Sequence, residues 1–95
     1  MKILTKSIEK KLPKLGGQEN KGLDAVAYVK FFTPWTSWTW YASEYSDGMF
    51  FGLVDGFVKE LGYFSLEELE SIKGPFGLRI ERDFYFQPTK LKELM

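Results

Sequence analysis

The feature that most constrains the fold is a hairpin signature at the middle of the chain. SWTWYASEY (37–45) alternates in character, so its side chains would divide between the two faces of a strand. Asp47-Gly48 follows, a dipeptide that favours a two-residue hairpin turn because both residues tolerate positive φ. MFFGLV (49–54) then supplies an apolar partner strand. The pattern predicts an antiparallel meander at the centre of the molecule.

Three further segments are expected to extend this meander. AVAYVKFFT (25–33) is rich in β-forming residues and predicts a preceding strand, which ends in a turn over TPWTS (33–37) because proline cannot join an interior strand. FVKELGYF (57–64) reads as partly extended. LRIERDFYF (78–86) predicts a strand at a sheet edge, since it carries several charges and a proline follows it.

The strongest helix signal lies in FSLEEL (64–69). Ser65 and Glu68 have the spacing of a capping box, in which the side chain of each residue accepts a hydrogen bond from the free backbone N–H of the other. Phe64 and Leu69 have the spacing of a hydrophobic staple, and a Gly-Pro pair stops the helix. We expect a helix over residues 65–73.

A shorter helix is expected near the N-terminus, capped by Thr5 and stopped by Pro13. LGGQENKG (15–22) reads as an exposed loop, and Thr89 is a candidate cap for a final helical turn. The fold class predicted is therefore α+β: one small domain over residues 1–95, with a three- or four-stranded antiparallel meander packed with two short helices.

Composition excludes several kinds of chemistry. The chain has no cysteine and no histidine, which removes disulfides, thiolate catalysis, cysteine zinc sites and the usual general base. No phosphate-binding glycine loop or EF-hand spacing is present, so we expect no cofactor and no metal. No secretion signal and no apolar run of about 20 residues is visible, which favours a cytoplasmic protein without membrane attachment.

Charge is balanced overall but unevenly distributed. Residues 1–22 carry six lysines against two glutamates, whereas residues 44–70 carry seven acidic residues against one lysine. Duplex-binding domains normally present a basic face, so nucleic acid is an unfavoured partner for a neutral chain with two arginines. The acidic middle segment is typical of solubility, or of a surface that meets a basic protein.

The aromatic cluster PWTSWTWYASEY (34–45) raises the question of a binding surface. Trp38 and Trp40 share one face of their strand and are expected to form the core, with a stacking platform for single-stranded bases as the alternative. Trp35 lies in a turn and could anchor a protein partner. The opposite strand face and the hairpin turn complete a candidate partner surface, which consists of Trp35, Tyr41, Tyr45, Glu44 and Asp47.

Enzymatic activity is not expected. A carboxylate-based hydrolase would need an open pocket that joins Glu44, Glu81 and Asp83. Asp47 and Asp55 precede glycines and are explained by turn chemistry alone.

Three stretches carry a family resemblance: FFTPWTSWTWYASEY, MFFGLVDGFVKELGYFSLEELESI and GPFGLRIERDFYFQPT. Together they resemble the bacterial domain-of-unknown-function family 2958. The resemblance implies an accessory protein of a plasmid, integrative element or phage, and it brings no catalytic residue. Our hypothesis is a small protein-binding module that acts on a host defence or regulatory protein, as a monomer or as a homodimer joined through an edge strand. A single-stranded nucleic-acid binder is the alternative.

Overall fold

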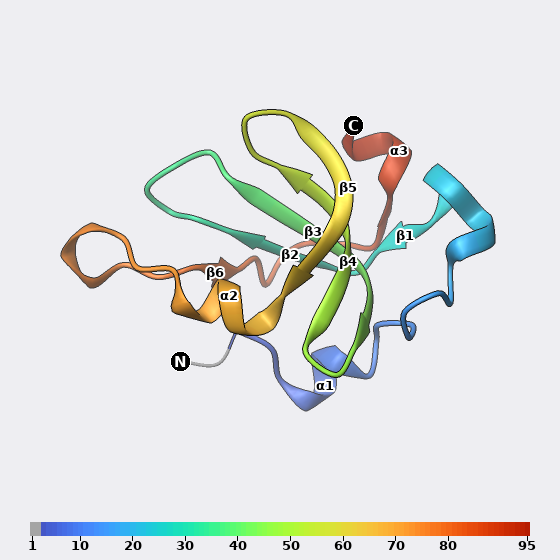
Figure 1. The fold of residues 1–95 in the computed structure, drawn as a ribbon, viewed down its shortest axis with the longest axis horizontal. Helices are drawn as coiled ribbons and strands as arrows, with labels where there is room; N and C mark the ends of the chain where they lie inside the picture. The colour runs from blue at the N-terminus through green and yellow to red at the C-terminus, as the bar shows by residue number, and fades with distance from the viewer. Residues whose placement is uncertain (1–2) are drawn as a thin grey trace.

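The expected hairpin lies at the centre of a five-stranded antiparallel sheet (Figure 1). The computed structural model describes residues 3–95. Asp47 and Gly48 form the turn with φ values of 45° and 85°, as the dipeptide predicts. The strand order in the sheet is β5-β4-β3-β2-β6. The strands are β2 (Val29–Phe32), β3 (Thr39–Ser46), β4 (Met49–Asp55), β5 (Lys59–Ser65) and β6 (Glu81–Arg82).

The remaining elements are short. A two-stranded sheet pairs β1 (Val26–Ala27) with β7 (Thr89–Lys90). The helices are α1 (Lys6–Glu9), α2 (Leu66–Ser71) and α3 (Leu91–Leu94), with 3₁₀ segments η1 (Glu19–Asp24) and η2 (Pro75–Gly77). The α+β class is confirmed, although the main sheet has five strands and the described residues form three α-helices. None of the helices within residues 3–95 has the length and apolar character needed to cross a membrane.

The main sheet is covered on both faces. The larger cluster lies against α1 and α2, below the sheet in Figure 1. Its buried members are Ile3, Leu4, Leu12, Val29, Phe31, Trp40, Ala42, Phe50, Phe64, Leu69 and Ile80. The opposite face carries a second cluster of Ala25, Ala27, Leu53 and Leu91, beside β1 and α3. The buried aromatic residues Phe31, Trp40, Phe50 and Phe64 all belong to the larger cluster, while the buried members of the second cluster are aliphatic.

The simple alternation predicted for residues 37–45 is wrong after Ala42. Ala42 pairs with Gly52 but Glu44 pairs with Phe51, so Ser43 is an extra residue in a β-bulge. A bulge reverses which side chains face which side of the sheet from that point on.

The bulge separates the two tyrosines that were expected on one face. Trp40 faces the larger cluster as predicted, and is 7% exposed. Tyr45 joins that same side, with its ring centroid 4.7 Å from that of Phe50. Tyr41 packs against the second cluster instead. Tyr41 and Tyr45 therefore lie on opposite faces of the sheet.

The Ser65 N-cap and the hydrophobic staple are confirmed, whereas the capping box forms only in part, because the Glu68 carboxylate accepts from the Ser65 hydroxyl instead of its backbone N–H. The Ser65 hydroxyl accepts a hydrogen bond from the Glu68 backbone N–H at 2.9 Å and donates one to the Glu68 carboxylate at 3.1 Å. The staple residues Phe64 and Leu69 are both buried in the larger cluster. The helix is shorter than expected, because Ile72 already adopts an extended conformation. Thr5 also caps α1, accepting from the Ile8 backbone N–H at 3.4 Å.

Three other expectations differ from the structure, because they depend on pairings between distant segments. The strand over 25–33 is interrupted at Tyr28, because β1 leaves the main sheet to pair with β7. The strand over 78–86 lies at an edge of the main sheet as predicted but is reduced to β6, since the Asp83 carboxylate accepts a hydrogen bond from the Tyr85 backbone N–H and turns the chain. Thr89 pairs with Ala27 instead of capping α3. The longer edge strand of the main sheet is therefore β5.

Candidate functional site

The predicted exposed loop at 15–22 is fixed to the sheet by the side chain of Gln18. Gln18 is 3% exposed. Its amide nitrogen donates to the carbonyl oxygens of Val26 (2.9 Å) and Ser43 (2.8 Å), and its amide oxygen accepts from the Val26 backbone N–H (2.8 Å). We call these three bonds the Gln18 latch. The expectation of an exposed loop is wrong at this residue, because the latch needs it between β1 and β3.

Glu44 forms the second attachment of the same loop. It is 5% exposed, and the bulge at Ser43 moves it from the face of Trp40 and Ala42 to the opposite face, where it pairs with Phe51. Its Oε1 accepts from the Gly16 backbone N–H and its Oε2 from that of Gln18, both at 2.9 Å. None of the ion pairs formed within residues 3–95 includes Glu44. Each carboxylate oxygen can accept more than one hydrogen bond, so acceptor capacity remains.

Glu44 lies in the wall of a hollow of about 340 Å³, which we call the Glu44 pocket. It opens where the second face of the sheet reaches the edge strand β5. The lining residues are Gly16, Gln18, Glu19, Gly22, Ala25, Ser43, Glu44, Phe51, Leu61, Tyr63 and Leu91. Two of them are acidic and none is basic. The rings of Phe51 and Tyr63 meet edge to face, with centroids 5.0 Å apart. The pocket thus combines a buried carboxylate with an apolar, aromatic wall.

A second feature occupies a different part of the surface. Segments 55–58 and 74–78 each contact segment 33–38, and we call these three segments the aromatic end. The Trp38 ring lies over Gly56 and meets the Phe57 ring at a centroid distance of 5.3 Å. The Trp35 ring lies against Gly74, so closely that a Cβ at this glycine would overlap it.

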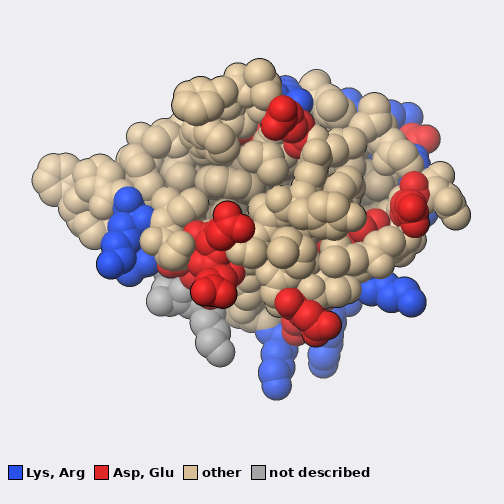
Figure 2. Space-filling view, viewed as in Figure 1, with Lys and Arg blue, Asp and Glu red and all other residues tan. Residues whose placement is uncertain are grey.

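Two phenylalanines project from the aromatic end. Phe57 is 92% exposed and Phe76 is 101% exposed, whereas the tryptophans beneath them are half-buried. In Figure 2 the tip of the projection at the left, which is segment 74–78 in Figure 1, is uncharged, and basic side chains lie at its base. Phe76 has a φ of 57°, in the left-handed region that residues other than glycine rarely adopt.

The five residues predicted as one partner surface are distributed over the molecule. Trp35 belongs to the aromatic end, Glu44 is buried in its pocket, and Asp47 is exposed at the hairpin turn. Tyr45 packs on the core. Tyr41 is half-buried with Lys30 Nζ 5.9 Å from its ring centre.

The surroundings of Tyr41 keep its hydroxyl neutral. Burial raises the pKa of Tyr41, and the carboxylates of Asp55 and Asp83 raise it further. Its ring also packs against that of Phe86, at a centroid distance of 5.7 Å. Tyr41 therefore serves the second cluster rather than a shared surface with Tyr45.

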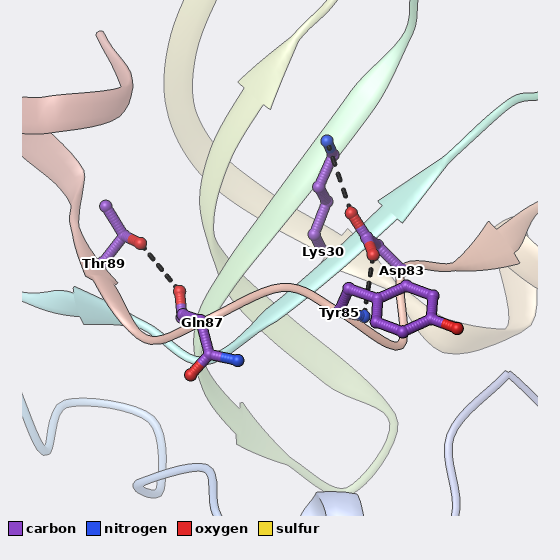
Figure 3. A network of polar contacts seen from close by, with 5 residues as sticks. All are labelled: Lys30, Asp83, Tyr85, Gln87 and Thr89. Carbon is purple, nitrogen blue, oxygen red and sulfur yellow. Dashed lines mark hydrogen bonds and ion pairs between the residues drawn. The ribbon is translucent and has the colours of Figure 1, made fainter.

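The pocket that the hydrolase hypothesis required does not form within residues 3–95. Glu44 lines one hollow, while Glu81 and Asp83 line another. Asp83 is held by Lys30, whose Nζ lies 3.7 Å from Oδ2, and by the Tyr85 backbone N–H at 2.9 Å (Figure 3). Residues 3–95 contain no group of three acidic side chains that could hold a metal ion.

Reasoning from the sequence missed Phe57, Phe76 and Gln18. The two phenylalanines carried a usable signal, since each stands next to turn-forming glycine or proline, where a large apolar side chain has no core to enter. Gln18 carried none, because its partners lie 8 and 25 residues away in the chain.

A family model described as "Protein of unknown function (DUF2958)" matches residues 3–93. No curated protein and no solved structure matches the chain.

Proposed function

The chain belongs to the DUF2958 family of proteins of unknown function, and because that description names no activity, we propose a function from the geometry. The protein is a binding module whose aromatic end inserts into an apolar recess on a partner protein. Phe57 and Phe76 are the anchors of this contact, and Trp35 and Trp38 support them.

The observation that carries this proposal is the nearly complete exposure of two phenylalanines on two loops that both contact segment 33–38. Burial of a phenylalanine side chain contributes about 1.5–3 kcal/mol, which neither side chain gains in the isolated chain. The Trp38 ring supports the Phe57 side chain directly, and the Trp35 ring supports the backbone of the other loop at Gly74, two residues before Phe76. A supported aromatic side chain loses little conformational freedom on binding, and such residues dominate interface energies.

Charge indicates what kind of surface the partner presents. Segments 33–38 and 74–78 carry no charged residue, and segment 55–58 carries only Asp55. A recess lined by apolar side chains is therefore complementary to the aromatic end. The acidic residues exposed on α2, Glu67, Glu68 and Glu70, favour a basic rim on the partner's adjoining surface.

The family resemblance supplies the proposed setting. It implies an accessory protein of a mobile genetic element in the bacterial cytoplasm. A host defence or regulatory protein is the partner class that fits such a setting.

A single-stranded nucleic-acid function is less well supported. Trp40 is buried and so cannot stack on a base, and the three loops of the aromatic end carry no lysine or arginine. Quenching of tryptophan fluorescence by an oligonucleotide at low salt would favour this alternative.

Site-directed photo-crosslinking in bacterial cytoplasm tests the proposal. A photoreactive phenylalanine analogue replaces Phe57 or Phe76, and as a matched control it replaces Tyr85, which is 89% exposed elsewhere on the surface. We expect one and the same protein in the adducts from positions 57 and 76 and not in those from position 85. Equal yields of that protein at all three positions, or none at 57 and 76, would refute it.

Affinity for the purified partner completes the test. The double variant Phe57→Ser, Phe76→Ser should bind about 30-fold more weakly or worse, since loss of an interface anchor costs about 2 kcal/mol or more. Tyr85→Ser should change affinity by less than about twofold. Unchanged binding by the double variant would show that the aromatic end is not the contact.

A further inference from the structure

We propose that the Glu44 pocket is a binding site for a guanidinium group carried on an apolar stem. This site is separate from the aromatic end, and the inference does not depend on the function proposed for that end. Its ligand class follows from three properties of the pocket: the state of the carboxylate, the nature of the walls and the position of the opening.

The carboxylate of Glu44 is buried without a cation. Within residues 3–95 its hydrogen-bond donors are two backbone N–H groups, one on each oxygen. Backbone amides satisfy part of the hydrogen-bonding capacity but do not neutralise charge, and a buried unpaired carboxylate is costly. Each oxygen retains the capacity to accept from one more donor. A guanidinium offers two parallel N–H groups, which match a carboxylate with one free position on each oxygen.

The walls fit the rest of such a ligand. Phe51 and Tyr63 present aromatic surface, on which a planar guanidinium stacks better than a compact, strongly hydrated ammonium does. Leu61 and Leu91 provide apolar surface for a methylene stem. Glu19 adds a second carboxylate, and no basic residue lines the pocket to oppose a cation. Its volume of about 340 Å³ lies within the range of ligand pockets.

The opening is accessible from the edge of the sheet. Leu61 is 42% exposed and Tyr63 is 69% exposed, and both belong to β5, the edge strand of the five-stranded sheet. An extended peptide beside β5 could direct an arginine side chain into the pocket. A small free guanidinium compound presents the same chemistry, and the experiment separates these two sources.

Titration of the ¹⁵N-labelled protein with N-acetyl-arginine amide, followed by amide chemical shifts, tests the proposal. We expect saturable shifts at Gly16, Gln18 and Tyr63. The matched ligand is N-acetyl-citrulline amide, which has nearly the same shape without the charge. It should bind at least about tenfold more weakly, because a charge-assisted bidentate pair is roughly twice as strong as a neutral one. Equal shifts with both ligands, or none with either, would overturn the assignment.

Variants localise the binding. Glu44→Gln should abolish the arginine-dependent shifts. The Glu44→Gln substitution also alters the attachment of the loop, so a second variant, Tyr63→Ala, leaves the Glu44 hydrogen bonds in place. If the Tyr63 ring stacks on the ligand, Tyr63→Ala should weaken binding about threefold to tenfold. Tyr85→Ala is the surface control and should bind as the wild type does. Wild-type affinity in both pocket variants would place the ligand elsewhere.

A peptide arm identifies the source of the guanidinium. A pentapeptide with arginine between β-branched residues should bind at least about tenfold tighter than N-acetyl-arginine amide if the backbone pairs with β5. Equal affinity would indicate a small free ligand in the same pocket. The double variant Phe57→Ser, Phe76→Ser should bind both as the wild type does, so failure here and failure of the aromatic end are distinguishable.

Discussion

Replacement of Gln18 by alanine tests the tertiary attachment of the loop over residues 15–22. The side chain of Gln18 forms three hydrogen bonds, to the backbone of Val26 twice and to the carbonyl of Ser43 once. The substitution removes all three and leaves backbone groups of β1 and β3 without these partners. Among the residues of this loop, Gln18 is the one whose substitution is expected to break the contacts with two strands at once.

The magnitude follows from the count of bonds. Each intramolecular hydrogen bond contributes about 1 kcal/mol net, so the three bonds of the Gln18 latch contribute about 3 kcal/mol to the free energy of unfolding. Gln18 also lines the Glu44 pocket, and water that enters there could satisfy some of the freed groups. We therefore expect a loss of about 2–3 kcal/mol, a large share of the roughly 5–15 kcal/mol typical of a small domain.

Urea unfolding followed by tryptophan fluorescence measures this loss. With a slope of about 1–3 kcal/mol per molar, the midpoint should fall by roughly 1–3 M while the slope stays unchanged. Gln87→Ala is the matched control, because the Gln87 side chain is exposed and its change should stay within about 0.5 kcal/mol. A loss below about 1 kcal/mol for Gln18→Ala would refute the reasoning, since three buried hydrogen bonds cannot vanish at so small a cost.

Two further predictions concern the sheet and its charges. Gly52→Ala should lower the unfolding free energy by about 4 kcal/mol or prevent folding, because its Cβ would overlap the Tyr41 carbonyl oxygen in the adjacent strand. Its cross-strand partner Gly62 has open space, so Gly62→Ala should raise the unfolding free energy by about 0.5–1 kcal/mol. Equal effects of the two substitutions in urea unfolding would contradict this contrast. A hydrogen bond from Lys92 lowers the pKa of Asp24 below its ordinary 3.8, so the stabilisation from this ion pair is present above that pH and lost as the pH falls through the folded-state pKa. The small difference in unfolding free energy between wild type and Asp24→Asn should therefore disappear in acid and in high salt. A difference that persists in acid would point to another cause.

The match to the family model confirms the family resemblance, and the local signals in the sequence agree with the structure. The Asp47-Gly48 turn and the Ser65 cap form as predicted, and both depend on residues within a few positions of one another. The prediction that Trp40 faces the core also holds, because it precedes the bulge. Each of these features is encoded by backbone preferences and by short-range periodicity, which do not depend on the rest of the fold.

The candidate sites, in contrast, depend on contacts between segments that are distant in the sequence. Which face of the sheet Glu44 occupies depends on one extra residue at Ser43, and the sequence of β3 contains no pattern that predicts this bulge. The Glu44 pocket joins residues of β3, β4 and β5 to the loop before β1 and to α3. The aromatic end likewise joins three loops that are far apart in the chain.

The sequence alone thus determined the class of the fold, its central hairpin and its best-capped helix. Only the tertiary structure decided which polar groups are buried, which aromatic side chains remain outside, and that Tyr41 and Tyr45 lie apart. The physical reason is that burial is a property of pairings between distant segments. A shift of register by one residue reverses the face on which every following side chain lies. The shifted and unshifted registers cannot be told apart when only neighbouring residues are considered.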